Sequence, residues 1–306
     1  MMKRKVNQDS RTWPEQSRLR AGLIMAAAAL LPGLLAGPAN AGPADRFAEV
    51  KVTAEPVRGS VHMLTGAGGN IGVSVGEDGT LIIDDQYAPL ADRIQAALDG
   101  LGGGKPKLIL NTHVHGDHTG GNAYFGTSGT IIAHDNVRIR LLEGEPERTA
   151  LPLVTYAERV TVHFNDEAIE LIHLPTGHTD GDSVVWFSTA NVIHMGDHLF
   201  VDRFPYIDVD SGGSVRGFMR NLAAVLEMVP DDVSVIPGHG PLTDKGAIAS
   251  SLEMIRATRQ IVADAVADGH SADAIVEQGL GDEWASYGAG FINEERWIRI
   301  LLSDFQ

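Results

Sequence analysis

The residues most able to do chemistry lie in a short string, Asn111-Thr-His-Val-His-Gly-Asp-His-Thr119, in which His113, His115, Asp117 and His118 fall close together. Neutral imidazole and carboxylate are ligands that suit Zn²⁺ and its first-row neighbours. A polar cluster of this density is costly to bury unless something pairs with it. The string therefore predicts a metal site.

Three further donors each follow a segment that is predicted to be a strand. They are His178 in Thr-Gly-His-Thr, Asp197 in Gly-Asp-His and His239 in Pro-Gly-His-Gly. Functional sites in α/β layouts gather beyond the carboxyl ends of strands. Taken alone, His178 or His239 is better interpreted as a surface or hydrogen-bonded histidine. Taken with the string, both are predicted to bind metal.

The positions within the string suggest two ions. His113 and His115 are two residues apart in an extended turn, so both side chains can face one ion, and Asp117 and His118 can be aimed at a second. Six other histidines lack donors around them and are predicted to pack or form hydrogen bonds: His62, His134, His163, His173, His194 and His270. His198 is ambiguous, because adjacent side chains on an extended segment tend to point apart.

The elements that must position these donors follow a plan of strands and helices. Strands are expected at 57–64, 71–75, 80–84, 107–110, 130–133, 159–164, 168–174, 183–187, 191–194 and 233–236, and helices at 89–98, 136–142 and 214–228, with a mainly helical tail from about 244. The chain shows two halves of similar plan. Two sheets face to face, with helices outside, would give a four-layer arrangement.

Composition narrows the classes of function. The sequence has no cysteine, so no disulfide or thiolate nucleophile is available. It has 24 basic and 40 acidic residues and a net charge of −16, which makes nucleic acid a poor partner. An anionic small-molecule substrate remains compatible, because two bound cations would reverse the potential inside the site.

Residues 1–41 have the pattern of a secretory signal peptide. A basic leader precedes the apolar run 21–36, and Ala39-Asn-Ala41 is a small-x-small cleavage site. The alternative is a membrane-anchoring helix, but the run is short for a span and is broken by glycine and proline. We expect a periplasmic or secreted protein, without stable membrane insertion after cleavage, whose domain is 42–306. Its oligomeric state is left open.

The ordered motifs resemble those of the metallo-β-lactamase-fold hydrolases. His-x-His-x-Asp-His is followed by Thr-Gly-His-Thr, Gly-Asp-His-Leu-Phe and Pro-Gly-His-Gly, and the resemblance covers roughly residues 57–245. It implies an αββα sandwich, in which two sheets carry helices on both outer faces and the metal site lies along one edge.

The resemblance also implies roles for the donors. It assigns the first zinc to His113, His115 and His178, and the second to Asp117, His118 and His239. Asp197 stands where the best-known secreted β-lactamases carry a cysteine and many other members an aspartate that bridges both ions. Asp84, at the end of its predicted strand, resembles a carboxylate that orients a metal-binding histidine, although it could simply cap a turn.

The implied activity is hydrolysis by a hydroxide that bridges two zinc ions, with Asp117 and His118 as catalytic residues. The substrate would be an amide or lactam. Two departures from the cysteine-bearing class, Asp197 and the Phe200 that replaces a substrate-binding lysine, weaken the lactam interpretation; Arg203 could substitute for the lysine. The alternatives are a lactone or thioester hydrolase, an iron-dependent oxidoreductase of the same fold and, least supported, a structural zinc module.

Overall fold

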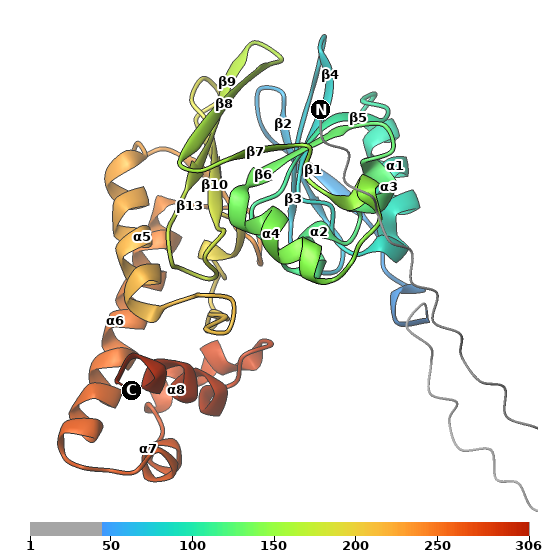
Figure 1. Cartoon of the computed structure of the whole chain (residues 1–306). Helices are drawn as coiled ribbons and strands as arrows, with labels where there is room; N and C mark the ends of the chain where they lie inside the picture. Colours follow the sequence, from blue (N-terminus) through green and yellow to red (C-terminus); the bar gives the residue numbers. More distant parts are fainter. Residues whose placement is uncertain (1–44, 306) are drawn as a thin grey trace, which may run out of the picture. The chain divides into compact units, whose positions relative to one another are not determined.

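Alternating apolar residues along the strands build two sheets, shown in Figure 1. The computed structural model describes residues 45–305, so the predicted signal peptide lies outside the described residues. The first sheet has seven strands in chain order. They are β1 (Thr53–Arg58), β2 (Val61–Thr65), β3 (Ile71–Gly76), β4 (Gly79–Ile83), β5 (Pro106–Leu110), β6 (Thr130–His134) and β7 (Val154–Tyr156). Strands β1 to β4 pair antiparallel, and β4 to β7 pair parallel.

The second sheet has six strands in the order β13-β12-β11-β10-β9-β8. They are β8 (Arg159–Phe164), β9 (Glu167–His173), β10 (Ser183–Phe187), β11 (Val192–His194), β12 (Ser234–Ile236) and β13 (Thr243–Asp244). Only β11 and β12 pair parallel. The 14-residue helix α5 (Val215–Met228) lies between these two strands in the sequence. A parallel pair needs such a crossover connection.

The layer between the sheets is filled by every second residue of facing strands. Leu81 and Ile83 of β4 point to this layer together with Val185 and Phe187 of β10, and all four are fully buried. Their neighbour Ile82 belongs to a different apolar cluster, on the outer face of the first sheet. This alternation is the two-residue period of a strand that is buried on both faces.

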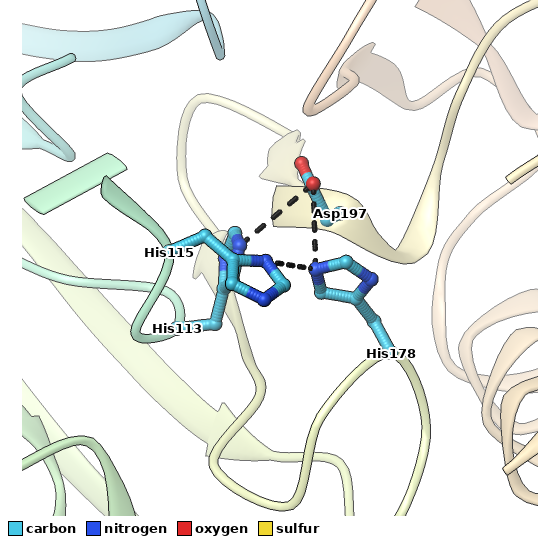
Figure 2. A group of neighbouring side chains, drawn as sticks. All are labelled: His113, His115, His178 and Asp197. Carbon is cyan, nitrogen blue, oxygen red and sulfur yellow. Dashed lines mark hydrogen bonds and ion pairs between the residues drawn. The ribbon is translucent and has the colours of Figure 1, made fainter. Parts of the chain in front are cut away.

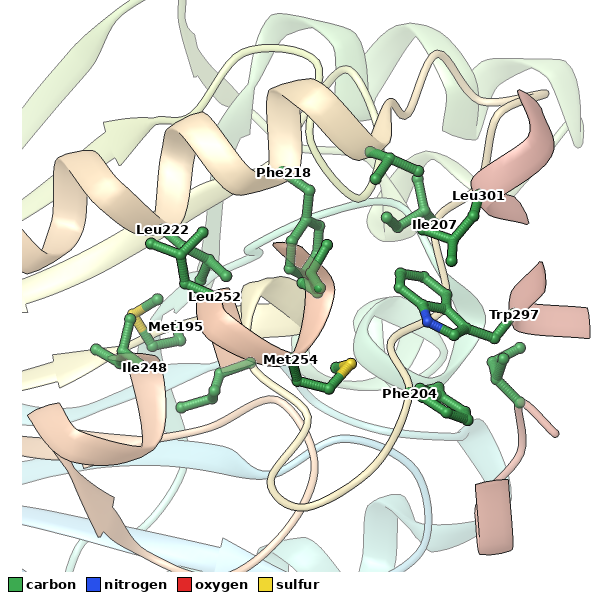
Figure 3. Packing of buried hydrophobic residues seen from close by; sticks show 14 of the residues in the cluster. Met195, Phe204, Ile207, Phe218, Leu222, Ile248, Leu252, Met254, Trp297 and Leu301 are labelled. Atoms are coloured by element: carbon green, nitrogen blue, oxygen red, sulfur yellow. The ribbon is translucent and has the colours of Figure 1, made fainter. Parts of the chain in front are cut away.

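Helices cover both outer faces. On the first sheet, α1 (Ala91–Gly100) and the short α3 (Asn122–Phe125) pack against that outer cluster, while α2 (Gly116–Thr119) and α4 (Asp135–Glu143) follow β5 and β6. On the second sheet lie α5 and α6 (Lys245–Ala267), then α7 (Ala272–Gln278) and α8 (Glu294–Leu302). Figure 3 shows Phe218, Leu222, Ile248 and Leu252 of α5 and α6 packed around Met195. The predicted four-layer αββα sandwich is thereby confirmed.

The structure corrects some predicted elements. The single strand expected at 57–64 is two strands, β1 and β2, because the chain turns at Gly59, whose φ is 56°. Strands β7 and β13 were not predicted. They span three and two residues, which is too short for an alternating pattern to show in the sequence.

The parallel strands bring their carboxyl ends to the same edge of each sheet. The chain leaves β4 at Asp84, β5 just before His113, β11 before Asp197 and β12 before His239. Residues that are far apart in the sequence therefore meet along one edge of the sandwich. No helix within residues 45–305 has the length and apolar character needed to cross a bilayer.

Trp297 anchors the C-terminal helices to the second sheet's outer cluster. It is fully buried, its indole Nε1 donates a hydrogen bond to Thr258 Oγ1 at 3.0 Å, and its ring stacks on Phe204 with centroids 5.6 Å apart. Figure 3 shows this contact beside Leu301 and Ile207.

We expect Trp297→Ala to lower the free energy of unfolding by about 3–5 kcal/mol, because it leaves a cavity in a packed core. Phe291→Ala in the same segment removes a ring that is 73% exposed, and should cost far less. Urea unfolding followed by circular dichroism measures both. Equal losses for the two variants would contradict the docking role of Trp297.

Candidate metal centre

Four strand ends supply the seven predicted ligands. His113 and His115 lie directly after β5, and α2 carries Asp117 and His118. His178 lies in the loop after β9, Asp197 in a 3₁₀ turn after β11 and His239 after β12. The side chains form two groups in which one donor atom from each residue lies within 4.8 Å of the others: His113, His115, His178 and Asp197, and Asp117, His118 and His239.

Two histidines of the first group face one carboxylate oxygen, and the third histidine contacts one of them, as Figure 2 shows. Asp197 Oδ2 lies 3.7 Å from His113 Nε2 and 3.4 Å from His178 Nε2. His115 Nδ1 lies 2.8 Å from His178 Nε2. Three ring nitrogens and one oxygen thus lie close together, and three of the four side chains are buried.

The second group surrounds the other oxygen of the same carboxylate. Asp197 Oδ1 lies 3.0 Å from His118 Nε2 and 3.3 Å from His239 Nε2. Asp117 Oδ2 is 3.5 Å from His239 Nε2 and 3.7 Å from His118 Nε2. Asp197 therefore contacts both groups, one with each oxygen, which is the position that the family resemblance implies for a bridging carboxylate.

Several of these atoms are buried without a hydrogen-bond partner. His113 Nε2, His118 Nε2 and Asp197 Oδ1 are among such atoms in residues 45–305, since the 3.0 Å approach of the last two is an ion-pair contact without hydrogen-bond geometry. Buried polar atoms without partners are rare in folded proteins and call for an explanation, such as an ion. Five imidazoles and two carboxylates are also a chemically suitable set of ligands for zinc or iron. The residues present thus fit a pair of cations.

In four of the candidate ligands, the second ring nitrogen of the histidine lies at hydrogen-bond distance from a neighbouring residue. Asp84 Oδ2 accepts a hydrogen bond from His118 Nδ1 at 2.7 Å, and the backbone carbonyl of Tyr206 accepts one from His178 Nδ1 at 2.7 Å. His115 Nε2 lies 2.9 Å from Asp208 Oδ2, and His113 Nδ1 lies 3.0 Å from Thr112 Oγ1. Such partners fix the ring orientation of a metal-binding histidine.

Asp84 makes more contacts than a turn cap would. Its φ of 63° is in the left-handed region, and its carboxylate also accepts hydrogen bonds from the backbone N–H and the hydroxyl of Thr112 at 2.8 and 2.7 Å. Its contact with His118 is the one expected for an orienting carboxylate. Asp208 and Tyr206 were not predicted, because they lie in a loop and no predicted strand end marks them.

The histidine pKa values follow from burial and from the neighbouring charges. Burial, reinforced by the charge of His118, holds the pKa of His113 well below its usual range, and burial lowers the pKa of His178 to about 3. Both rings are therefore uncharged at neutral pH. Burial raises the pKa of Asp197, but the surrounding histidines more than offset this and leave it well below the usual range.

His118 behaves differently because three carboxylates surround it. Burial lowers its pKa, but Asp197, Asp84 and Asp117 together raise it well above the usual range. This position therefore favours a positive charge. A bound cation can take the place of that proton, since metal binding requires the neutral imidazole.

Two glycines let the backbone approach the ligands. A Cβ at Gly69 would overlap the imidazole of His118, and one at Gly238 would overlap the carboxylate of Asp197. The glycine-rich connection at 65–70, predicted only as a flexible link, thus forms a wall of the site.

The remaining histidines lie outside both groups. His194 Nε2 donates to Asn70 O at 3.2 Å, and His134 stacks on His173 with centroids 3.7 Å apart. His198 turns away from the site: it stacks on Phe218 and its Nε2 accepts a hydrogen bond from Asn221 Nδ2 at 3.0 Å.

A cavity of about 450 Å³ opens directly onto the ligands. His115, Asp117, Asp197 and His239 form part of its lining. The rest is mainly glycine and apolar or aromatic side chains, with one arginine: Gly68, Tyr87, Gly116, Phe200, Arg203, Phe204, Tyr206, Phe291 and Ile292. The ligands are thus accessible from one side to a small molecule.

Comparison with known families matches residues 64–252 to the metallo-beta-lactamase superfamily. The chain belongs to this superfamily. The matched range holds both sheets from the end of β2 onward and all seven candidate ligands.

The curated relatives that the chain matches are named for different activities. The chain is 27% identical over 158 residues to a metallo-beta-lactamase type 2 of Bacteroides fragilis, which covers 52% of this chain and 60% of that protein. It is 32% identical over 152 residues to a hydroxyacylglutathione hydrolase of Rhodospirillum rubrum. This match covers 49% of this chain and 54% of that protein. It is 25% identical over 229 residues to the 2,4-dinitroanisole O-demethylase subunit alpha of a Nocardioides strain. This match covers 74% of this chain and 69% of that protein. The match thus spans only part of each relative.

Solved structures share the fold at low sequence identity. A metallo-beta-lactamase from Pontibacter korlensis aligns with a TM-score of 0.59 at 17% identity, covering 67% of this chain and 99% of that one. The DIM-1 metallo-beta-lactamase aligns with a TM-score of 0.60 at 19% identity, covering 68% and 99%. These likenesses support the αββα architecture.

Asp197→Ala should reduce metal binding more than any change at an orienting residue, because Asp197 contacts both groups. Equilibrium dialysis against zinc, followed by elemental analysis, measures the ions retained per chain and also identifies zinc or iron in protein as isolated. Glu253→Ala, which removes an exposed carboxylate from α6, is the matched control and should match the wild type. Unchanged metal content in Asp197→Ala would contradict the bridging position.

Proposed function

We propose that this protein is an exported, dinuclear zinc hydrolase that cleaves a carbonyl substrate. One observation carries the proposal: Asp197 presents one oxygen to two histidines of the first group and the other oxygen to two histidines of the second group. A single closed, four-coordinate structural site would not need such a double arrangement or an open cavity. The aspartate at this position supports two ions that share one ligand.

Different residues of the chain would bind the metal ions, orient the ligands and transfer a proton. Two zinc ions would supply an activated water at neutral pH and polarise a carbonyl oxygen. The neutral rings of His113 and His178 offer their lone pairs without first losing a proton. His118, held by Asp84, fixes the second group. Asp117 lines the cavity and can accept a proton from an attacking water or pass one to a leaving group.

The substrate class proposed first is an amide or lactam, with lactones and thioesters as alternatives. The lactamase and hydroxyacylglutathione hydrolase relatives support carbonyl hydrolysis in general. Phe200 lines the cavity where the cysteine-bearing lactamases carry a lysine, which favours weak rather than strong lactamase activity. Arg203, also in the lining, is the basic residue available to replace it.

A panel of a chromogenic cephalosporin, an acyl-homoserine lactone and an acyl thioester tests the proposal on the zinc-loaded protein. We expect hydrolysis of at least one, lost on chelation and restored by zinc rather than by iron. Asp197→Ala should lower kcat/KM by at least about 100-fold, which exceeds the usual effect of a residue that only orients a ligand.

Glu253→Ala should keep wild-type kcat/KM, as the carboxylate control. Absence of turnover on all three substrates with two zinc ions bound would refute the carbonyl hydrolase. Turnover that needs iron and a redox partner would instead favour the oxidoreductase alternative.

Export is proposed from the sequence of residues 1–41 alone. Expression of the full chain in a Gram-negative host should yield a periplasmic protein whose N-terminus is Gly42. Replacing Ala39 and Ala41 by bulky residues should block processing, because the cleavage site needs small side chains. Mass spectrometry of the periplasmic and cytoplasmic fractions measures both. An unprocessed wild-type chain in the cytoplasm would contradict export.

A further inference from the structure

A cluster of apolar side chains is exposed beside the last strand of the first sheet. Within the described residues, eight large apolar side chains are exposed, and four of them fall between positions 139 and 154. Ile139 and Leu142 on α4 are 57% and 48% exposed, and Leu153 and Val154, at the start of β7, are 74% and 41% exposed. We call these four residues the α4–β7 patch. Apolar side chains that gather in this way, rather than singly, mark an interaction surface.

The two elements that carry the α4–β7 patch are joined to each other. The guanidinium of Arg138 on α4 donates a hydrogen bond to the backbone carbonyl of Pro152, directly before Leu153. Both elements also adjoin β6, because α4 begins directly after this strand and β7 pairs with it in parallel. Val137 is the one buried residue of α4, so the other apolar side chains of this helix are not part of the core. The patch is therefore one surface that two neighbouring elements share.

The strand in this patch has an open edge. Among the described strands, β7 is the last of its sheet and pairs with β6 alone. Within residues 45–305, the backbone of 154–156 makes no hydrogen bond outside that pairing. The strand contains neither proline nor a charged residue, which are the usual protections of such an edge. Its outer N–H and C=O groups are thus available to another strand.

A recess in the surface adjoins the α4–β7 patch. It has a volume of about 220 Å³, and Leu153 lines it together with Ile131, Leu151 and Arg148. In a dimer with two-fold symmetry the same surface lies on both sides, so it must hold both projecting side chains and a recess that receives them. The exposed side chains of α4 and this recess meet that requirement.

The charges around the α4–β7 patch indicate what it binds. The chain has a net charge of −16, yet positions 135–159 hold four arginines and five acidic residues and are nearly neutral. Two copies of this acidic chain repel each other least here. Within residues 45–305, four exposed charged side chains next to the patch form no ion pair, whereas Arg140 nearby is paired: Glu143, Glu145, Glu147 and Arg148. The acidic turn at 143–147 and Arg148 are therefore free to pair with another chain.

We propose that the α4–β7 patch is the interface of a symmetric homodimer. Strand β7 pairs antiparallel with β7 of the second copy, and the apolar side chains of α4 pack against the recess of that copy. The acidic turn at 143–147 faces Arg148 across the two-fold axis. Adjacent clusters of opposite charge are complementary to a second copy of themselves when the two are related by such an axis. The cavity at the metal centre shares no residue with the patch, so the interface leaves it open.

Sedimentation velocity tests the proposal on zinc-loaded protein purified after expression of the full chain. We expect a dimer of twice the chain mass, in an equilibrium with monomer that depends on protein concentration. Leu153→Asp places an unpaired carboxylate in the interface of each copy and should weaken dimerisation at least about 100-fold. Because Leu153 is exposed in the single chain, thermal unfolding of this variant, measured where both proteins are monomeric, should match the wild type. Met228→Asp is the control, since it places the same charge at an exposed apolar position on α5, and it should dimerise like the wild type.

Exchange of charges tests the two-fold contact itself. Arg148→Glu, and a second variant that combines Glu145→Arg with Glu147→Arg, should each be monomeric alone, because like charges then face each other. Mixed in equal amounts, the two variants should form a heterodimer, because one contact is then native and the other has its signs exchanged. Arg256→Glu, which reverses an exposed charge on α6, is the control and should remain dimeric by itself.

Three results would overturn the proposal. A wild-type chain that sediments as a monomer at every concentration would leave the α4–β7 patch to a different partner. Dimerisation of Leu153→Asp as tight as that of Met228→Asp would place the interface elsewhere on the molecule. Charge variants that stay monomeric when mixed would contradict the pairing of the acidic turn with Arg148. None of these results depends on turnover, so the dimer and the hydrolase are tested separately.

Discussion

The carboxylate of Asp197 is 5% exposed and lies between two groups of ring nitrogens, and the rest of the site is arranged around it. Removing such a charge from water is costly unless opposite charge surrounds it. The nearby histidines hold its pKa low, yet His113 and His178 are themselves kept neutral by burial. A pair of cations would balance this arrangement, because cations satisfy the carboxylate and the imidazole lone pairs together.

The αββα sandwich surrounds the carboxylate of Asp197 with other polar side chains because it brings several strand ends to one edge. Parallel pairing in β4 to β7 and in β11 to β12 places Asp84, His113, Asp197 and His239 on adjoining turns. Loops alone would position these groups less precisely, whereas strands buried on both faces leave little freedom at their ends. The close approaches at Gly69 and Gly238 show how little space remains around the ligands.

One loop links the first ligand group to the cavity. Tyr206 holds His178 through its backbone carbonyl while its ring lines the cavity, and Asp208 two residues later contacts His115. The ring of Tyr206 also touches Phe291 from the C-terminal segment. The tail that follows the superfamily match therefore contacts the cavity lining at Tyr206 and, through Trp297, at Phe204, and it supplies none of the candidate ligands.

The sequence by itself was enough to predict the candidate ligands, because three imidazoles and a carboxylate within six positions, and donors after predicted strands, are local signals. Alternation of apolar residues likewise predicted most strands, although it missed β7 and β13, which are too short to show a period. Only the tertiary structure decided that Asp208, Tyr206 and Phe291 belong to the site. They lie on loops without periodicity, and their positions depend on how α8 and the 201–213 segment pack against the second sheet, a long-range outcome that no local pattern encodes.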